Sequence, residues 1–282
     1  MNIKMKLQKR YHKIYNVNIN KTGGFFMKSK ILKSIIASLL SVAMLMSFAA
    51  CGGSDSEEDK KNGSAGASAS DNADVNSDEK STIDKNAQVG DYITFGSYEQ
   101  DGNTSNGKES IEWLVLDVQD GKALVISKYA LDCKQYHEDY VDTTWENCTL
   151  RTWLNNDFYN IAFSSSEKNK ISTTNIIAED NLECETEAGN DTQDKVFLLS
   201  ISEAEKYFSS DNERMCKPTQ YAINNGVFEY VDSYEGNCWW WLRSPGTSLD
   251  YASYIYGGGI VVYDGESVDF GHAIRPALWV NL

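Results

Sequence analysis

The sequence predicts an α+β fold, because strand signals and helix signals occupy separate stretches of the chain and do not alternate. Strand-like runs come first, at residues 91–98, 111–118 and 122–127. Helical periodicity follows at residues 149–171, and the last 45 residues return to strand-like segments that are rich in aromatic side chains. This order predicts a mixed or antiparallel sheet with two or three short helices.

The first strands are separated by recognisable loops and turns. Polar and apolar residues alternate along 91–98, and a polar loop at 100–108 follows. Asp120-Gly121 separates two apolar runs, and this pair is preferred in a two-residue hairpin turn because both positions need positive φ. We therefore expect a β-hairpin over residues 111–127.

Two helices are expected after this hairpin. Thr149 can cap a helix over 149–163, and Ser164 with Glu167 has capping-box spacing for a second, short helix. Six residues of the first helix follow the spacing of one buried face: Leu150, Trp153, Leu154, Phe158, Ile161 and Ala162.

The next segments mix loops with short elements. Residues 179–194 hold seven carboxylates and are expected to form a solvated loop. A strand is expected at 195–200, and a capping box at 202–205 predicts a short helix that ends near Phe208. Residues 217–225 are expected to form a helical turn.

The tail is expected to be a strand meander. A buried strand is expected over 238–246, and strands at 251–256 and 260–263 are joined by three glycines. Asp264-Gly265 is expected to be a second hairpin turn, and residues 274–280 to form one closing strand.

The N-terminal region has the pattern of an export signal. Three lysines precede the uncharged run 35–50, whose 16 residues are fewer than the ~20 that cross a bilayer as a helix. Small residues follow, and then Cys51, as in a bacterial lipobox, although Phe48 stands where Leu is usual. We expect Cys51 to be lipidated and the mature chain to be extracytoplasmic, anchored to the outer face of the cell membrane.

Three segments are predicted from composition. Residues 1–50 are an upstream extension with a lipoprotein signal peptide, in which translation is expected to start at Met27 instead of Met1. Residues 51–88, rich in Gly, Ser, Asn and Asp, lack large apolar side chains and are expected to be a flexible linker. Residues 89–282 are expected to be a single domain.

The charge distribution excludes one class of partner. Residues 1–50 carry nine Lys and Arg and no acids, so residues 51–282 hold 17 basic and 41 acidic residues, a net charge of −24. Binding to nucleic acid relies on basic side chains that displace counterions. We therefore expect no nucleic-acid partner.

Cofactor signals are weak. Asp74, Asn76 and Asp78 match the first three ligand positions of an EF-hand loop, but Glu79 replaces the required Gly and Lys85 replaces the closing Glu. No other motif supports calcium, and the identity of any metal site stays open. We expect no cofactor.

Enzyme motifs are also missing from the sequence. The expected mature chain contains two histidines, His137 and His272, and no zinc-protease, nucleophile-elbow or phosphate-loop motif. A thiol site built from Cys238, His272 and an Asp can be imagined, but no family signature supports it. Enzymatic activity is left open, with a binding protein favoured.

Five cysteines follow Cys51, so at least one thiol is free or pairs with another molecule. Cys133 and Cys148 could form a disulfide, and buried free thiols are an equal alternative. The other three are Cys184, Cys216 and Cys238. No CxxC spacing supports zinc.

The tail and the front of the domain resemble a large family of uncharacterised domains in secreted and lipoprotein-type products of Gram-positive gut bacteria. The resemblance covers residues 89–282. It rests on Trp-Trp-Leu-Arg-Ser-Pro-Gly at 240–246, on Ile-Arg-Pro-Ala-Leu-Trp at 274–279, and on the front segments 89–91, 95–98, 113–116 and 150–155.

More distantly, the tail is similar to the C-type-lectin-like fold of formylglycine-generating enzymes and of variable ligand-binding proteins. Chains of that fold commonly close on a Gly-Phe/Val-Arg-Pro segment, where His272-Ala273-Ile274-Arg275-Pro276 stands here. This resemblance implies a C-type-lectin-like sheet. It does not imply the oxidase activity, because no cysteine follows Cys238 to complete the copper-binding pair.

The aromatic tail is expected to provide a contact surface. Tyr and Trp present an apolar face and a polar edge, which suits stacking on sugars or gripping a protein. The hairpin between the two motif strands is expected to be an exposed layer. The ligand-binding candidates are Trp239, Trp241, Tyr251, Tyr254, Tyr256, Tyr263 and Asp264.

Four other residues of the tail are expected to be structural: Trp240, Arg243, Arg275 and Trp279. The two arginines are expected to hold buried carboxylates or carbonyls instead of a ligand.

These observations favour a lipid-anchored binding or adhesion module for a glycan or a protein ligand. The first alternative is a cell-surface hydrolase that acts on an extracellular polymer. The second is a solute-binding lipoprotein that serves a transporter.

Overall fold

The computed structural model describes residues 83–227 and 235–282. The chain divides into two units, Met1–Asp78 and Glu79–Leu282, and all described residues belong to the second. The expected signal peptide, Cys51, and most of the expected linker lie outside the described residues. Ile83 and Ala87 are buried in the core, so the packed part of the chain starts before residue 89.

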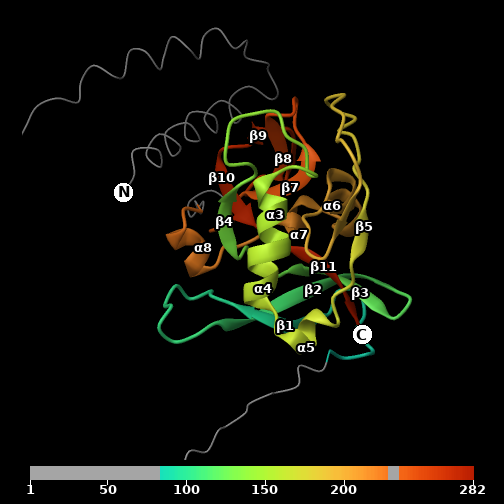
Figure 1. Cartoon of the computed structure of the whole chain (residues 1–282), viewed down its shortest axis with the longest axis vertical. Helices are drawn as coiled ribbons and strands as arrows, with labels where there is room; N and C mark the ends of the chain where they lie inside the picture. Colours follow the sequence, from blue (N-terminus) through green and yellow to red (C-terminus); the bar gives the residue numbers. More distant parts are fainter. Residues whose placement is uncertain (1–82, 228–234) are drawn as a thin grey trace, which may run out of the picture. The chain divides into compact units, whose positions relative to one another are not determined.

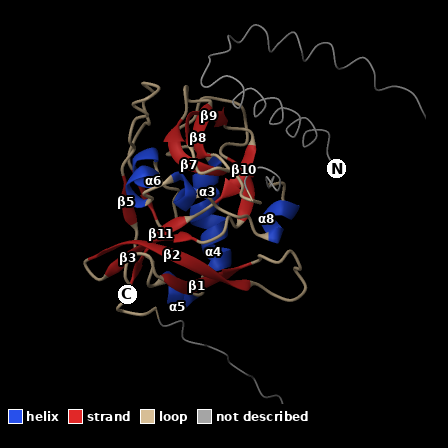
Figure 2. Ribbon diagram, turned by 180° about the vertical axis from the view of Figure 1, so that it is seen from behind, coloured by secondary structure: helices blue, strands red, loops and turns tan. Residues whose placement is uncertain are grey.

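The fold is mixed α+β and mostly antiparallel, as predicted, with two main sheets (Figures 1 and 2). One sheet has four strands in the order β1 (Tyr92–Tyr98), β2 (Glu109–Gln119), β3 (Lys122–Ser127) and β11 (Ala277–Asn281). The predicted hairpin turn is confirmed, because Asp120 and Gly121 have φ of 49° and 73° between β2 and β3.

The second sheet has five strands. Its order is β4 (Asp132–Gln135), β10 (Gly271–Ile274), β7 (Trp240–Pro245), β8 (Tyr251–Ile255) and β9 (Val261–Ser267). Only β10 and β7 run parallel; the other neighbours are antiparallel.

The last segment of the chain joins the two sheets. The single strand expected over 274–280 is wrong, because the chain leaves β10 at Ile274 and enters β11 at Ala277. Pro276 lacks an N–H for a sheet ladder, and its carbonyl accepts a hydrogen bond from Ser127 N at 2.9 Å. Arg275-Pro276 is therefore the crossover between the sheets.

One continuous helical segment runs beside both sheets (Figure 1). It comprises α3 (Thr149–Trp153), the π-helical turn η1 (Leu154–Phe158) and α4 (Tyr159–Ala162). The cap predicted at Thr149 is wrong: Cys148 is the capping residue, and its Sγ accepts a hydrogen bond from Arg151 N at 3.4 Å. Ile161, expected on the buried face, is 46% exposed.

Short helices and one small ladder complete the fold. The capping box of Ser164 and Glu167 is confirmed at α5. The second box is formed by Ser200 with Glu203, so the prediction that Ser202 opens this helix is wrong. The elements are α5 (Ser165–Lys168), α6 (Ile201–Tyr207), α7 (Asp211–Arg214), α8 (Gln220–Asn224), β5 (Thr174–Ile176) and β6 (Thr192–Asp194).

Three local predictions are corrected by long-range packing. Residues 195–200 form no sheet strand, and only Phe197 bridges to Ala277. The acidic segment 179–194 is not wholly solvated, since Asn181 and Asp194 are each 1% exposed. Asp264-Gly265 lies inside β9 as a bulge, where Gly265 has φ of 78° and a Cβ would meet the Ala252 carbonyl at 2.6 Å.

Candidate functional site

A buried cluster of aromatic rings covers one face of the five-stranded sheet. Trp239 stacks on Tyr254 with ring centroids 5.2 Å apart, and it lies 4.7 Å from Tyr256. His272 on β10 lies between Trp241, at 4.2 Å, and Tyr254, at 4.9 Å. Trp239 and Trp241 alternate along the segment that enters β7, and Tyr254 and Tyr256 along the segment that leaves β8, so these four rings share one face with His272 of β10.

The cluster is not the exposed layer that the sequence suggested. Trp239, Trp241, Tyr254 and Tyr256 are 4%, 0%, 3% and 6% exposed. The expected exposure is therefore wrong for these four ligand-binding candidates. The reason is that these rings pack on one another, and that Tyr136 and His272 pack against Trp241 on the same side.

The four residues expected to be structural lie in or against the core. Trp240 is fully buried, and Trp279 is half-buried. Arg243 pairs with the Glu203 carboxylate and donates to the Leu198 carbonyl at 2.8 Å.

Arg275 is enclosed in the same way. Its Nε donates to the Ser127 carbonyl at 2.9 Å, and its guanidinium lies 5.3 Å from the Phe208 ring and 5.1 Å from the Trp240 ring. Both arginines of the tail motifs thus connect separate segments of the core.

The remaining candidates are accessible but lie in different surroundings. Tyr263 is half-buried, and its hydroxyl donates to Glu205, which raises the pKa of Tyr263 to about 12. Asp264 is exposed and lies beside Cys184. Tyr251 is half-buried and lies against Tyr140.

Tyr140, which is exposed, and the half-buried Tyr251 and Asp250 form a group that we call the tyrosine surface. Tyr140 is 56% exposed and lies beside the Asp250 carboxylate, and this contact is the main reason that the pKa of Tyr140 is raised. Asp250 also accepts a hydrogen bond from Ser248. Although partial burial raises the pKa of Asp250, the bonds from Ser248 and Tyr140 lower it overall.

The tyrosine surface is strongly acidic. The pKa of Tyr251 is raised, first by partial burial and then by the negative charges of Glu266, Asp250 and Asp269. Within residues 83–227 and 235–282, none of these carboxylates forms an ion pair with a lysine or arginine. A group that binds here therefore meets acceptors and negative charge next to two phenol rings.

The loop that carries Tyr140 is held in place at both ends. Thr143 N donates to the Leu249 carbonyl at 2.9 Å, which ties the loop to the turn before β8. At its start, Tyr136 is 2% exposed, and its hydroxyl donates to the Arg243 carbonyl at 2.8 Å. Tyr140 could not be identified as a candidate from sequence, because its partner Asp250 lies far along the chain.

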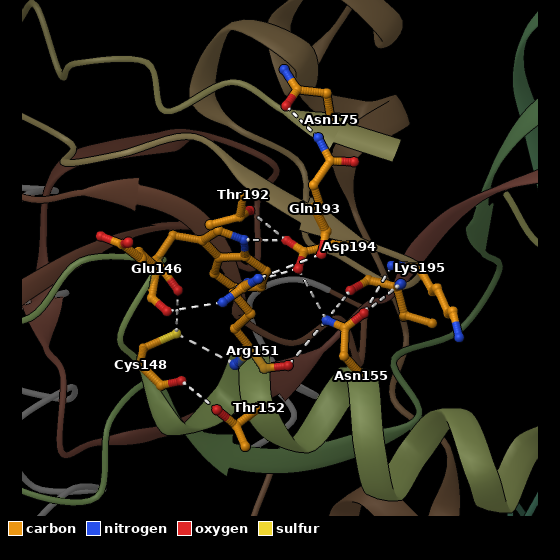
Figure 3. A network of polar contacts seen from close by, with 12 residues as sticks. Glu146, Cys148, Arg151, Thr152, Asn155, Asn175, Thr192, Gln193, Asp194 and Lys195 are labelled. Carbon is orange, nitrogen blue, oxygen red and sulfur yellow. Dashed lines mark hydrogen bonds and ion pairs between the residues drawn. The ribbon is translucent and has the colours of Figure 1, made fainter. Parts of the chain in front are cut away.

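A polar network fixes the end of the loop 137–148 where α3 begins (Figure 3). Asp194 is 1% exposed and accepts hydrogen bonds from Arg151 Nε at 2.7 Å, Trp145 Nε1 at 2.9 Å and Thr192 Oγ1 at 2.7 Å. Arg151 also donates to the Glu146 carbonyl at 2.9 Å. The network holds the start of α3 against β6 and so fixes the position at which the loop 137–148 joins the helix.

The cysteines of the described residues are free thiols. The Cys148 thiol caps α3. Cys133 and Cys148 are both free thiols, so the possible disulfide between them does not occur in this structure. Folding brings Cys238 against Cys216, whose carbonyl accepts from Cys238 N at 2.8 Å. The Cys238 thiol also donates to that carbonyl, at 3.3 Å.

Among the described residues, no helix is both long enough and apolar enough to cross a membrane.

Comparison with known proteins identifies one domain family. Residues 120–282 match the model of the DUF6273 family, described as a domain of unknown function. No curated protein and no solved structure matches the chain. The match includes the two tail motifs and all three residues of the tyrosine surface, and it covers more than half of the chain. The chain therefore belongs to the DUF6273 family.

Proposed function

We propose that this protein is an extracytoplasmic binding module that recognises a neutral glycan through the tyrosine surface and is held to the cell membrane by a lipid on Cys51. The observation that carries the proposal is the partly exposed contact of Tyr140, Tyr251 and Asp250 in an acidic setting. The lipid anchor rests on the charged, apolar and small-residue pattern that ends at Cys51.

The chemistry of this surface favours a sugar ligand. A phenol ring offers a flat apolar face on which the C–H face of a pyranose can stack, and its hydroxyl can bond at the edge. Carboxylates accept hydrogen bonds from sugar hydroxyls. Anionic polymers are disfavoured, because residues 51–282 carry a net charge of −24.

The proposal extends to a C-type-lectin-like arrangement of the domain. The last strand β11 pairs with β3 in the sheet of the first strands, so the beginning and end of the domain share one sheet. The loop 137–148 and the turn at 246–250 meet beside β8, where a long-loop binding region would be expected. The alternative ligand for this surface is a protein.

We expect Tyr140→Ala and Tyr251→Ala each to weaken binding to a neutral glycan by about 5–10-fold, the value of one aromatic stacking contact. A glycan array with the full-length protein in detergent finds the ligand, and calorimetry with that glycan measures the loss. Tyr92→Ala is the matched control, because Tyr92 is a 55% exposed tyrosine on β1. Thermal melts confirm that all three variants fold.

Other outcomes of the array experiment separate the rival functions. Equal losses in the Tyr92 variant and the two surface variants would remove the tyrosine surface from the proposal. Capture of a basic peptide with no glycan bound would assign a protein ligand. Shortening of a polysaccharide or peptide polymer during incubation would instead favour a hydrolase, and tight binding of a small solute would favour a transporter partner.

The anchor makes a separate prediction. We expect Cys51→Ser to abolish incorporation of radiolabelled palmitate and to release the protein from the membrane fraction. One diacylglycerol buries two acyl chains at ~0.8 kcal/mol per CH₂, which is enough for stable retention. Cys184→Ser is the control for loss of a thiol. Equal labelling of the Cys51 variant and the wild type would contradict the anchor.

A further inference from the structure

Three carboxylates meet at the loop between β1 and β2. Glu99 follows the last residue of β1, and Glu109 is the first residue of β2, which pairs with Tyr98 across the antiparallel ladder. This pairing brings the two acids together, and Asp101 joins them from the loop. One oxygen from each of Glu99, Asp101 and Glu109 lies within 4.8 Å of the others.

Glu99 is unusual within this group because it is buried. Its exposed fraction is 9%, and its Oε1 is shielded and has no hydrogen-bond partner in the part of the chain that the structure describes. A carboxylate buried in this way is costly unless a positive charge or a donor compensates it. Burial, the contact with Asp101 and the charge of Glu109 raise the pKa of Glu99, and the backbone N–H of Gly102 offsets only part of this effect.

No basic side chain supplies that compensation. The ion pairs of the described ranges include none of these three carboxylates. Lys108, the nearest lysine in sequence, donates instead to the Ile161 carbonyl at 2.7 Å. Three negative groups therefore converge without a cation from the protein.

The loop holds these carboxylates in fixed positions. The Glu109 carboxylate accepts from Gln100 N at 2.6 Å, and the Asp101 carboxylate accepts from Asn103 N and Asn106 Nδ2, both at 2.7 Å. The Gln100 carbonyl accepts from Tyr221 N at 3.0 Å, which ties the loop to the start of α8. The Glu99 carboxylate keeps a shielded oxygen, Oε1, for another ligand.

We propose that Glu99, Asp101 and Glu109 form a binding site for one hard divalent cation, with calcium as the preferred ion. Carboxylate oxygens are the ligands of Ca²⁺ and Mg²⁺, and a loop rich in Asn, Ser and Gly suits the variable geometry that calcium accepts and magnesium does not. Within the loop, Asp101, Asn103 and Ser105 alternate as oxygen-bearing side chains. The site lies at the β1–β2 loop, whereas the tyrosine surface belongs to the loop 137–148 and the start of β8. The labelled strands β1 and β8 lie at opposite ends of the domain in Figures 1 and 2.

The cation would stabilise the folded protein. It would bind the end of the β1–β2 hairpin, which already contacts α8, and would neutralise the repulsion between the three acids. Calcium sites in extracellular modules have Kd values on the order of 10⁻⁴–10⁻³ M. At 10 mM CaCl₂ such a site raises the melting temperature of a domain this size by about 3–10 °C.

The experiment compares the full-length protein, purified in detergent and treated with EDTA, with and without added CaCl₂ or MgCl₂. Calorimetry counts the ions bound, and thermal melts measure the stabilisation. We expect one calcium site, a higher melting temperature with calcium, and a smaller effect of magnesium. A stronger effect of magnesium would contradict the preferred ion, and absence of a shift with either ion at 10 mM would overturn the site.

The Glu99→Gln variant distinguishes loss of the cation site from loss of the folded structure. In EDTA this variant should melt at or above the temperature of the wild type, because one of three repelling charges is gone, yet it should lose the calcium shift. Glu183→Gln/Glu187→Gln is the matched control, since both residues are exposed carboxylates in the acidic segment 179–194. A calcium shift that persists in Glu99→Gln, or that is lost equally in the control, would refute the assignment.

Discussion

Replacement of Trp240 by alanine is expected to lower the free energy of unfolding by about 3–5 kcal/mol. Trp240 is 0% exposed on β7, the middle strand of the five-stranded sheet. Its Nε1 donates to the Arg214 carbonyl at 3.1 Å, and the guanidinium of Arg275 lies 5.1 Å from its ring. The substitution leaves a large cavity, an Arg214 carbonyl that keeps only a 3.5 Å contact with Arg275, and an arginine without one of its two aromatic neighbours.

Urea unfolding monitored by far-ultraviolet circular dichroism measures this loss. Two tyrosines of β8 serve as graded controls. Tyr254→Ala should also be strongly destabilising, because Tyr254 is 3% exposed and packs on Trp239, Trp241 and His272. Tyr251→Ala should cost less than ~1.5 kcal/mol, because Tyr251 is half-buried at the surface. A larger loss for Tyr251→Ala than for Trp240→Ala would contradict the assignment of the core.

Local chemistry explains why much of the fold could be predicted from the sequence. The Asp120-Gly121 turn and the Ser164–Glu167 capping box depend on residues within a few positions of each other, and both are confirmed. The predictions from sequence were wrong where contacts between distant segments determine the local structure. Thr149 does not cap the helix, because its Oγ1 accepts a hydrogen bond from Glu138 N at 3.1 Å, eleven residues earlier in the chain. The cap is instead the Cys148 thiol, which also donates to the Trp145 carbonyl.

The same reasoning explains what was missed at the candidate sites. The Gly, Tyr, Ser and Asp composition of the tail hairpin is typical of an exposed layer. The exposure of its tyrosines depends, however, on which side chains from other segments pack on the same face of the sheet. The Tyr140–Asp250 contact joins segments that are far apart in sequence. For the cation site a signal was present, because acids flank a loop of Gly, Asn and Ser at 99–109, but only the β1–β2 register shows that they converge.

Asp194→Ala is expected to lower the free energy of unfolding by about 3–5 kcal/mol, because it breaks a buried ion pair from one side. Asp194 is 1% exposed, and its removal leaves Arg151, Trp145 Nε1 and Thr192 Oγ1 without their shared acceptor. Asp194→Asn should cost less, because it keeps one oxygen acceptor. Asp142→Ala, at an exposed aspartate of the loop that the network positions, is the control and should stay within about 0.5 kcal/mol of the wild type.

A double-mutant cycle with Arg151→Ala separates this ion pair from simple loss of packing. Arg151 and Asp194 share one bond at 2.7 Å, so the double variant should be more stable than the sum of the two single losses predicts, by about 0.5–3 kcal/mol. The same variants test whether the network positions the tyrosine surface. If it does, Asp194→Asn should weaken glycan binding even where the variant is still folded, because the loop 137–148 ends at this network. Additive losses in the cycle, with unchanged binding, would show that Asp194 contributes only packing.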